Sequence, residues 1–190
     1  MTLHSYFEYL GGLLPVSGSD LNSAAASILE CIRDQKSIWI MGNGGSASTA
    51  EHFETDLSFI RKGNSFTKIK VSALTANSSL ISAIANDIGY ENIFSHQLFR
   101  RAEPGDLCIL ISASGNSQNL IEAAGAAKHI GLHTLGFLGF DGGKLEQILD
   151  TSIIVRTEIG KYGPVEDIHL AICHALSEIV GQKLFSAGVL

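Results

Sequence analysis

Short apolar runs alternate with segments of helix length along most of this 190-residue chain, and this alternation constrains the fold most strongly. Continuous apolar strands joined by helices of ten or more residues are typical of a parallel sheet that is covered on both faces. Crossovers between parallel strands are right-handed, so helices occupy both sides. The pattern predicts a three-layer α/β/α sandwich around a five-stranded parallel sheet. The expected strands are 37–41, 69–74, 107–112, 134–138 and 153–155, and the expected helices are 4–14, 20–35, 46–59, 77–85, 91–101, 117–129 and 165–185.

Length and composition indicate one globular domain, which we expect to span residues 1–190. The net charge of -6, with no concentrated block of Lys and Arg, argues against a nucleic-acid partner. Cys31, Cys108 and Cys173 are odd in number and widely spaced, which favours reduced thiols in a cytoplasmic protein. No basic N-terminal region precedes an apolar stretch and no apolar run approaches the length of a membrane span, so we expect no membrane association.

A glycine-serine loop, Gly42-Asn-Gly-Gly-Ser-Ala-Ser48, follows the first expected strand and leads directly into a helix. Its amides and hydroxyls next to a helix N-terminus indicate a site for an anion or for sugar oxygens. The loop also matches the Gly-x-Gly-x-x-Ala pattern of dinucleotide-binding proteins. That fold requires a carboxylate at the end of the next strand, where residues 74–77 have none, so a nucleotide is disfavoured. A plain tight turn is the other alternative.

A serine loop, Ser112-Ala-Ser-Gly-Asn-Ser117, follows the third expected strand, again just before a helix. Hydroxyls, exposed amides and a helix N-terminus can cradle a phosphate without any basic residue. A loop that merely caps the helix is the alternative explanation. Two such loops at neighbouring strand ends together favour a phosphorylated ligand.

Two helical segments carry ionisable side chains. His52 and Asp56 are four residues apart and share one helix face, which suits a divalent metal, a proton relay or a simple surface pair. Glu166 and His174 lie on the last helix, eight residues and roughly 12 Å apart. Either only one of these two acts in a given site, or two subunits combine to build it.

The two loops, together with Ala83-Ile-Ala-Asn-Asp87 and Asp141-Gly-Gly143, resemble those of the SIS family of phosphosugar isomerases and binding proteins, and in particular the phosphoheptose isomerases. The resemblance implies a flavodoxin-like, doubly wound sheet. It implies an aldose–ketose isomerase that converts sedoheptulose 7-phosphate to D-glycero-D-manno-heptose 7-phosphate through an enediol. The rival is a non-catalytic SIS protein that binds a sugar phosphate or a protein for regulation.

The resemblance also implies roles for individual residues. The catalytic candidates are Asp56, Glu166 and His174, and the metal candidates are His52, Asp56, Glu166 and His174 around one zinc ion per subunit. The substrate-binding candidates are Asn43, Gly44, Gly45, Ser46, Asn86, Asp87, Ser112, Ala113, Ser114, Ser117 and Glu166. Asp56 stands where the family has Glu, and Glu166 where it has Gln. Either Glu166 supplies the longer carboxylate that Asp56 lacks, or the two changes alter the preference for substrate or metal. The family pattern further implies a homotetramer with sites at subunit interfaces, in which the helices of residues 4–35 pack on the sandwich and on a neighbouring subunit.

Overall fold

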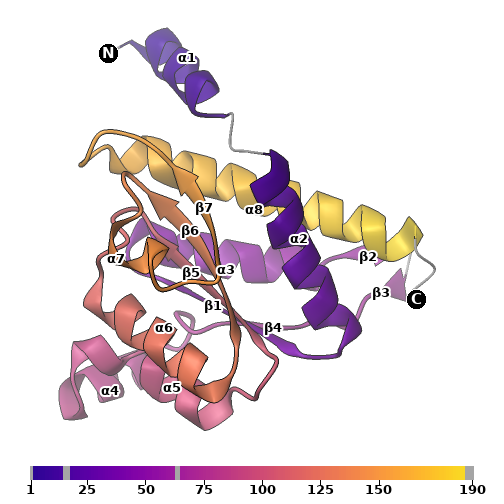
Figure 1. Ribbon diagram of the computed structural model, residues 1–190, viewed down its shortest axis with the longest axis vertical. Coiled ribbons are helices and arrows are strands. Elements are labelled where there is room, and N and C mark those ends of the chain that lie inside the picture. Colours follow the sequence, from indigo (N-terminus) through magenta and orange to yellow (C-terminus); the bar gives the residue numbers. More distant parts are fainter. Residues whose placement is uncertain (1, 15–17, 63–64, 187–190) are drawn as a thin grey trace.

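The computed structural model describes residues 2–14, 18–62 and 65–186. Its central sheet is parallel throughout, as predicted, and all five expected strands are present (Figure 1). In spatial order the strands are β4 (Lys70–Ala73), β1 (Ser37–Gly42), β5 (Leu107–Ser112), β6 (His133–Gly139) and β7 (Thr151–Val155). This is the flavodoxin-like order, in which the chain changes direction across the sheet between β1 and β5. Ligands of such sheets bind at that switch point, beyond the carboxyl ends of the strands.

Each face of the sheet is covered by its own hydrophobic core. Along β1 the side chains alternate, so that Ile38 and Ile40 enter one core while Trp39 and Met41 enter the other. The first core is closed by α2 (Gly18–Arg33), α3 (Gly45–Ser58) and α8 (Tyr162–Ser186). The second is closed by α4 (Ser78–Asp87), α5 (Ser95–Arg101), α6 (Gln118–Ile130) and α7 (Gly143–Glu146), and the 3-10 turn η1 (Tyr90–Asn92) lies in the chain between α4 and α5. The predicted three-layer sandwich is therefore confirmed (Figure 1).

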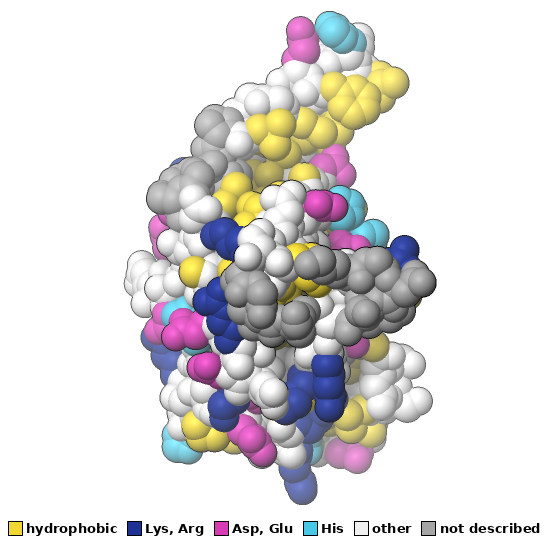
Figure 2. Space-filling model, turned by 90° about the vertical axis from the view of Figure 1, so that its right-hand side faces the viewer, with side chains coloured by type: hydrophobic (Ala, Val, Ile, Leu, Met, Phe, Trp, Pro, Cys, Tyr) yellow, Lys and Arg dark blue, Asp and Glu magenta, His cyan; other side chains and the backbone are white. Residues whose placement is uncertain are grey.

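The first helix, α1 (Leu3–Leu13), projects from the sandwich (Figure 1). It begins with a capping box between Thr2 and Ser5, and none of its residues is buried. Leu10 and Leu13 pack against the core, whereas Phe7 is 61% exposed on the projecting part. Figure 2 shows hydrophobic side chains along this projecting helix. Of the two N-terminal helices, α2 thus contributes buried residues to the core, whereas α1 contacts the sandwich through Leu10, Leu13 and a hydrogen bond from the Tyr6 hydroxyl to Asp167 of α8.

Some local features differ from the sequence expectation. A short antiparallel hairpin, β2 (Arg61–Lys62) with β3 (Ser65–Phe66), follows α3. The sequence did not predict it, because strands of two residues are too short to show a periodicity. The last helix begins at Tyr162, three residues earlier than expected, because Pro164 lies in the first turn, where no amide hydrogen is needed. The expected helix 91–101 is divided into η1 and α5. All three cysteines are buried free thiols. Among the described residues, no helix has the length and apolar character needed to cross a membrane.

Candidate active site

The loops that follow β1 and β5 face each other at the switch point of the sheet and border a cavity of about 180 Å³. The cavity therefore joins the two loops that the sequence singled out with two residues of the last helix. Its lining consists of Asn43, Ser46, Ile111, Ser112, Ala113, Ser114, Ser117, Tyr162 and Glu166. Tyr162 was not expected in this lining, because the last helix was predicted to begin only at residue 165.

The glycine loop brings its backbone close to other groups. Gly44 has φ +56, in the left-handed region that favours glycine, and no side chain caps α3 at this position. A Cβ atom on Gly45 would lie 2.4 Å from Oε2 and 2.6 Å from Oε1 of Glu166. The Glu166 carboxylate therefore rests against the loop backbone, in space that exists because residue 45 has no side chain.

The serine loop is held in place by backbone amides. The Ser112 hydroxyl accepts a hydrogen bond from the Gly115 amide at 3.0 Å, and the Ser114 hydroxyl accepts one from the Asn116 amide at 3.2 Å. Both hydroxyls keep their own hydrogens as donors. Ser117 occupies the N-cap position of α6 but makes no side-chain capping bond. The capping alternative therefore does not account for the Ser117 hydroxyl.

The segment that begins with the motif Asp141-Gly-Gly143 packs against the serine loop. The Lys144 amide donates to Oδ1 of Asn116, and the Leu145 amide donates to the carbonyl of Gly115. A Cβ atom on Gly115, which has φ +63, would overlap the Gly142 carbonyl. This close approach explains in physical terms why glycines are needed in both segments.

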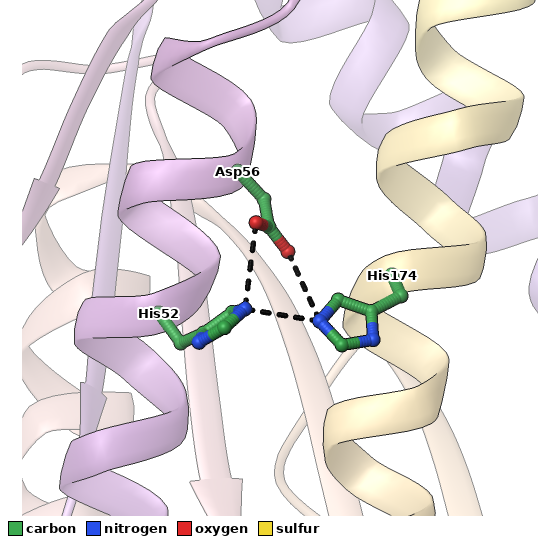
Figure 3. A group of neighbouring side chains, drawn as sticks. All are labelled: His52, Asp56 and His174. Atoms are coloured by element: carbon green, nitrogen blue, oxygen red, sulfur yellow. Dashed lines mark hydrogen bonds and ion pairs between the residues drawn. The ribbon is translucent and has the colours of Figure 1, made fainter.

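A second group of polar side chains lies between α3 and α8 (Figure 3). Nε2 of His52 lies 2.9 Å from Nε2 of His174, so one ring nitrogen donates and the other accepts. Oδ1 of Asp56 lies 3.5 Å from Nε2 of His52, and Oδ2 of Asp56 lies 3.7 Å from Nε2 of His174. His52 and Asp56 project from one face of α3, as their spacing predicted, and the three ligand atoms lie within 4.8 Å of one another.

This group fits a divalent cation. Oδ2 of Asp56 is buried and has no hydrogen-bond partner among the described residues, which is an energetic cost that a cation between the three side chains would remove. Two imidazoles and one carboxylate are a common ligand set of catalytic zinc sites, which keep a further position open. A hollow of about 520 Å³ opens beside Asp56 and His174, and its lining includes Arg61, Ser177 and Gln182.

Glu166 is not part of the His52–Asp56–His174 group within one chain. It precedes His174 by eight residues along α8, or roughly 12 Å. It also lies against Gly45, which precedes Asp56 by eleven residues along α3, or roughly 16 Å. One chain therefore carries two separate groups, and a direct compensation between Asp56 and Glu166 requires two subunits.

Asn86 and Asp87 lie outside the lining of the cavity. They are exposed at the end of α4, where the Asn86 amide donates to the Asp87 carboxylate at 2.8 Å. The chain just beyond them does reach the glycine loop, because the Tyr90 hydroxyl hydrogen-bonds to Asn43. Neither Tyr90 nor Asn119, which also bonds to Asn43, was singled out from the sequence.

His169 lies on the same helix as Glu166 and is completely buried. Its Nε2 lies 3.0 Å from the carbonyl of Leu138 at the end of β6. Burial lowers the pKa of His169 to about 4, so the ring is neutral near pH 7. Its position indicates a structural role.

Comparisons with known proteins identify relatives along nearly the whole chain. The SIS domain matches residues 7–139. The phosphoheptose isomerase of Geotalea daltonii is 36% identical over 96% of this chain and 94% of its own length. A probable phosphoheptose isomerase of Thermoplasma acidophilum is 37% identical over 84% of this chain and 86% of its own length.

Solved structures of similar proteins agree with these relatives. The phosphoheptose isomerase GmhA of Neisseria gonorrhoeae has a TM-score of 0.84 at 29% identity, covering 95% of this chain and 97% of its own. The phosphoheptose isomerase of Francisella tularensis has a TM-score of 0.87 at 25% identity, covering 96% and 100%. The chain therefore belongs to the SIS-domain family, among the relatives named phosphoheptose isomerases.

Proposed function

We propose that this protein is an aldose–ketose isomerase that converts sedoheptulose 7-phosphate to D-glycero-D-manno-heptose 7-phosphate. The observation that carries the proposal is the likeness to phosphoheptose isomerases over more than nine-tenths of both chains. The cavity between the glycine and serine loops supports it, because its hydroxyls and the N-terminus of α6 suit a phosphate. The non-catalytic alternative is not favoured, since His52, Asp56, Glu166 and His174 all retain groups that can transfer protons or bind a metal.

We assign phosphate binding to the serine loop, through Ser112, Ser114 and Ser117. Asn43 and the glycine loop then meet oxygens of the sugar. Isomerisation requires one group to remove a proton from the carbon next to the carbonyl and another to deliver protons to the oxygens. Because the phosphate and the reacting carbons lie at opposite ends of a seven-carbon chain, the phosphate cradle and the proton-transfer groups must be separated. The separation of the cavity from the His52–Asp56–His174 group is compatible with this requirement.

We propose that His52, Asp56 and His174 hold one divalent metal ion per subunit, which we expect to be zinc. When bound, such an ion polarises a carbonyl and stabilises an enediolate. Asp56 or Glu166 is the candidate base for the carbon-bound proton, and His174 is the candidate acid, through its Nδ1 proton because its Nε2 faces the metal position. Glu166 is the proposed fourth ligand only where a neighbouring subunit supplies it, because it lies away from the group in its own chain.

We propose further that the active protein is a cytoplasmic homotetramer whose sites lie at subunit interfaces. Two observations support the assembly: Glu166 is separated from the other three ionisable residues, and α1 leaves the large apolar side chains of Leu3 and Phe7 exposed. The three unbridged thiols support a reducing compartment.

The activity is tested by incubating the metal-replete protein with ketose phosphates of five to seven carbons in D₂O, with and without a chelator. We expect sedoheptulose 7-phosphate to give an aldose that carries deuterium at C2, because the enediol exchanges its proton with solvent. Unphosphorylated sedoheptulose is the matched control and should react far more slowly. Binding of the ketose phosphate without turnover would contradict the proposal and favour a regulatory SIS protein.

The shared site is tested by mixing two inactive variants, Glu166→Ala and His174→Ala, after dissociation and reassembly. If sites combine residues of two subunits, some sites in the mixed oligomer contain both native residues and activity returns in part. A mixture that stays as inactive as its components shows that each chain uses its own Glu166 and His174.

A further inference from the structure

The side-chain amides of Asn43 and Asn119 form a reciprocal pair beside the cavity. Nδ2 of Asn43 donates to Oδ1 of Asn119 at 2.9 Å, and Nδ2 of Asn119 donates to Oδ1 of Asn43 at 2.8 Å. The Tyr90 hydroxyl adds a third bond, to Oδ1 of Asn43 at 3.1 Å. Asn119 is only 2% exposed, so the pair is anchored in the interior on one side.

These bonds leave Asn43 with one free group. An asparagine amide has two acceptor lone pairs and two N–H donors. Both lone pairs of Asn43 are occupied, by Asn119 and Tyr90, and one of its N–H donors is occupied by Asn119. Among the described residues, no acceptor faces its second N–H, and Asn43 lines the cavity. Within this network the Asn43 side chain can offer a ligand only a hydrogen-bond donor.

The network also joins three segments that are distant in the sequence. Asn43 belongs to the glycine loop, and Asn119 lies in the first turn of α6, directly after the serine loop. Tyr90 lies on η1, just beyond Asn86 and Asp87. The single amide of Asn43 therefore fixes the positions of these segments relative to one another.

We infer that Asn119 and Tyr90 are positioning residues that hold the Asn43 amide as a donor toward an oxygen acceptor of the bound ligand, a hydroxyl or carbonyl oxygen of the sugar. This inference rests on the proposed function, since it assigns the group that Asn43 meets. A free asparagine amide can rotate and present either its oxygen or its nitrogen to a ligand. In Asn43, by contrast, Asn119 and Tyr90 occupy both lone pairs of the oxygen, so the oxygen cannot accept a hydrogen bond from the ligand. Asn119 and Tyr90 therefore affect ligand binding only through the Asn43 side chain.

The test is a double-mutant cycle on kcat/KM with four proteins: the parent, Asn43→Ala, Asn119→Ala and the double variant. A misplaced binding group can lower kcat/KM on the order of a hundredfold, so we expect Asn119→Ala to lose about ten- to a hundredfold. The double variant should be no worse than Asn43→Ala alone. Losses that multiply in the double variant overturn the inference, because Asn119 would then act independently of Asn43.

Tyr90→Phe provides the test that does not depend on a buried substitution, since Tyr90 is 57% exposed. Loss of one neutral hydrogen bond predicts about a two- to tenfold fall in kcat/KM, which should vanish in the Asn43→Ala background. Asn92→Ala on η1 is the matched control and should leave kcat/KM unchanged. An unchanged kcat/KM in Tyr90→Phe, or the same loss in the Asn43→Ala background, overturns the inference.

A second readout separates this inference from the proposed function. In ¹⁵N-labelled protein without ligand, Tyr90→Phe and Asn119→Ala should each shift the side-chain amide signals of Asn43 and speed their exchange with water. If the parent has no isomerase activity, the proposed function fails and these signals still decide the positioning. Signals of Asn43 that stay unchanged in both variants overturn it, whatever the activity.

Discussion

Replacing Gly45 by alanine is expected to disable the enzyme without unfolding it, because the added methyl group displaces the Glu166 carboxylate. The Cβ atom would lie 2.4 Å from Oε2, 2.5 Å from Cδ and 2.6 Å from Oε1 of Glu166. The carboxylate must therefore retreat by about 1 Å to reach an ordinary van der Waals distance. It can do so, because it is the end of a flexible side chain, and the backbone of Gly45 is not in the left-handed region.

The effects on stability are expected to offset each other. Alanine in place of glycine in a helix stabilises by about 0.5–1 kcal/mol, and a side chain forced from its rotamer costs about 0.5–1.5 kcal/mol. The free energy of unfolding should thus change by less than about 1 kcal/mol. A displacement of about 1 Å at a reacting group can cost on the order of a hundredfold in rate, so kcat/KM should fall by about that factor.

The assay is conversion of sedoheptulose 7-phosphate, together with urea unfolding of the same samples. Gly125→Ala on the exposed side of α6 is the control, because its added Cβ would meet no described atom within 4 Å beyond its chain neighbours and the adjoining backbone of its own helix. It should gain about 1 kcal/mol of stability and keep its activity. On a Glu166→Ala background, Gly45→Ala should cause no further loss. A folded Gly45→Ala protein with the parent kcat/KM would refute a role for the carboxylate at this place, and so would a loss that persists without Glu166.

Further expected outcomes concern phosphate, metal and pH. Ser114→Ala and Ser117→Ala should each raise KM for the sugar phosphate by roughly ten- to a hundredfold, because a hydrogen bond to a charged group is worth about 1.5–3 kcal/mol. Unchanged steady-state KM values in both variants would contradict the assignment of phosphate binding to the serine loop. Elemental analysis of protein purified without chelator should find about one divalent ion per chain, lost in His52→Ala, and a fully active, metal-free parent would contradict this. The pKa of His169 is about 4 in the folded protein, below the value of about 6.5 in the unfolded chain. The unfolded state therefore binds the extra proton, and the free energy of unfolding should fall by about 3 kcal/mol as the pH drops from 6.5 toward 4. His169→Gln should lack this part of the pH dependence in urea unfolding at several pH values, and an equal acid sensitivity of parent and variant would assign it to other groups.

Much of the fold could be predicted from the sequence, since the central strands are buried on both faces. The whole of β5, Leu107–Ser112, is buried, and such a strand appears as an unbroken apolar run. The hairpin of β2 and β3 could not be predicted, because two residues carry no periodicity. The projection of α1 was also hidden, since a helix with apolar residues indicates that something covers it but not whether the cover comes from its own chain.

The candidate site, like the fold, could be predicted only in part from the sequence. The sequence by itself determined the two loops and the His52–Asp56 pair, because loop residues follow directly from strand ends and a spacing of four places two side chains on one helix face. Only the tertiary structure decided which distant groups join them. The packing of α8 against α3 brings His174 to His52, and the same packing carries Glu166 to Gly45 instead. Likewise, the hydrogen bonds from Asn119 and Tyr90 to Asn43 depend on how three loops meet at one edge of the sheet. The physical reason is that sequence periodicity reports the face of a helix within its own element, whereas the partner of that face depends on how separate helices pack.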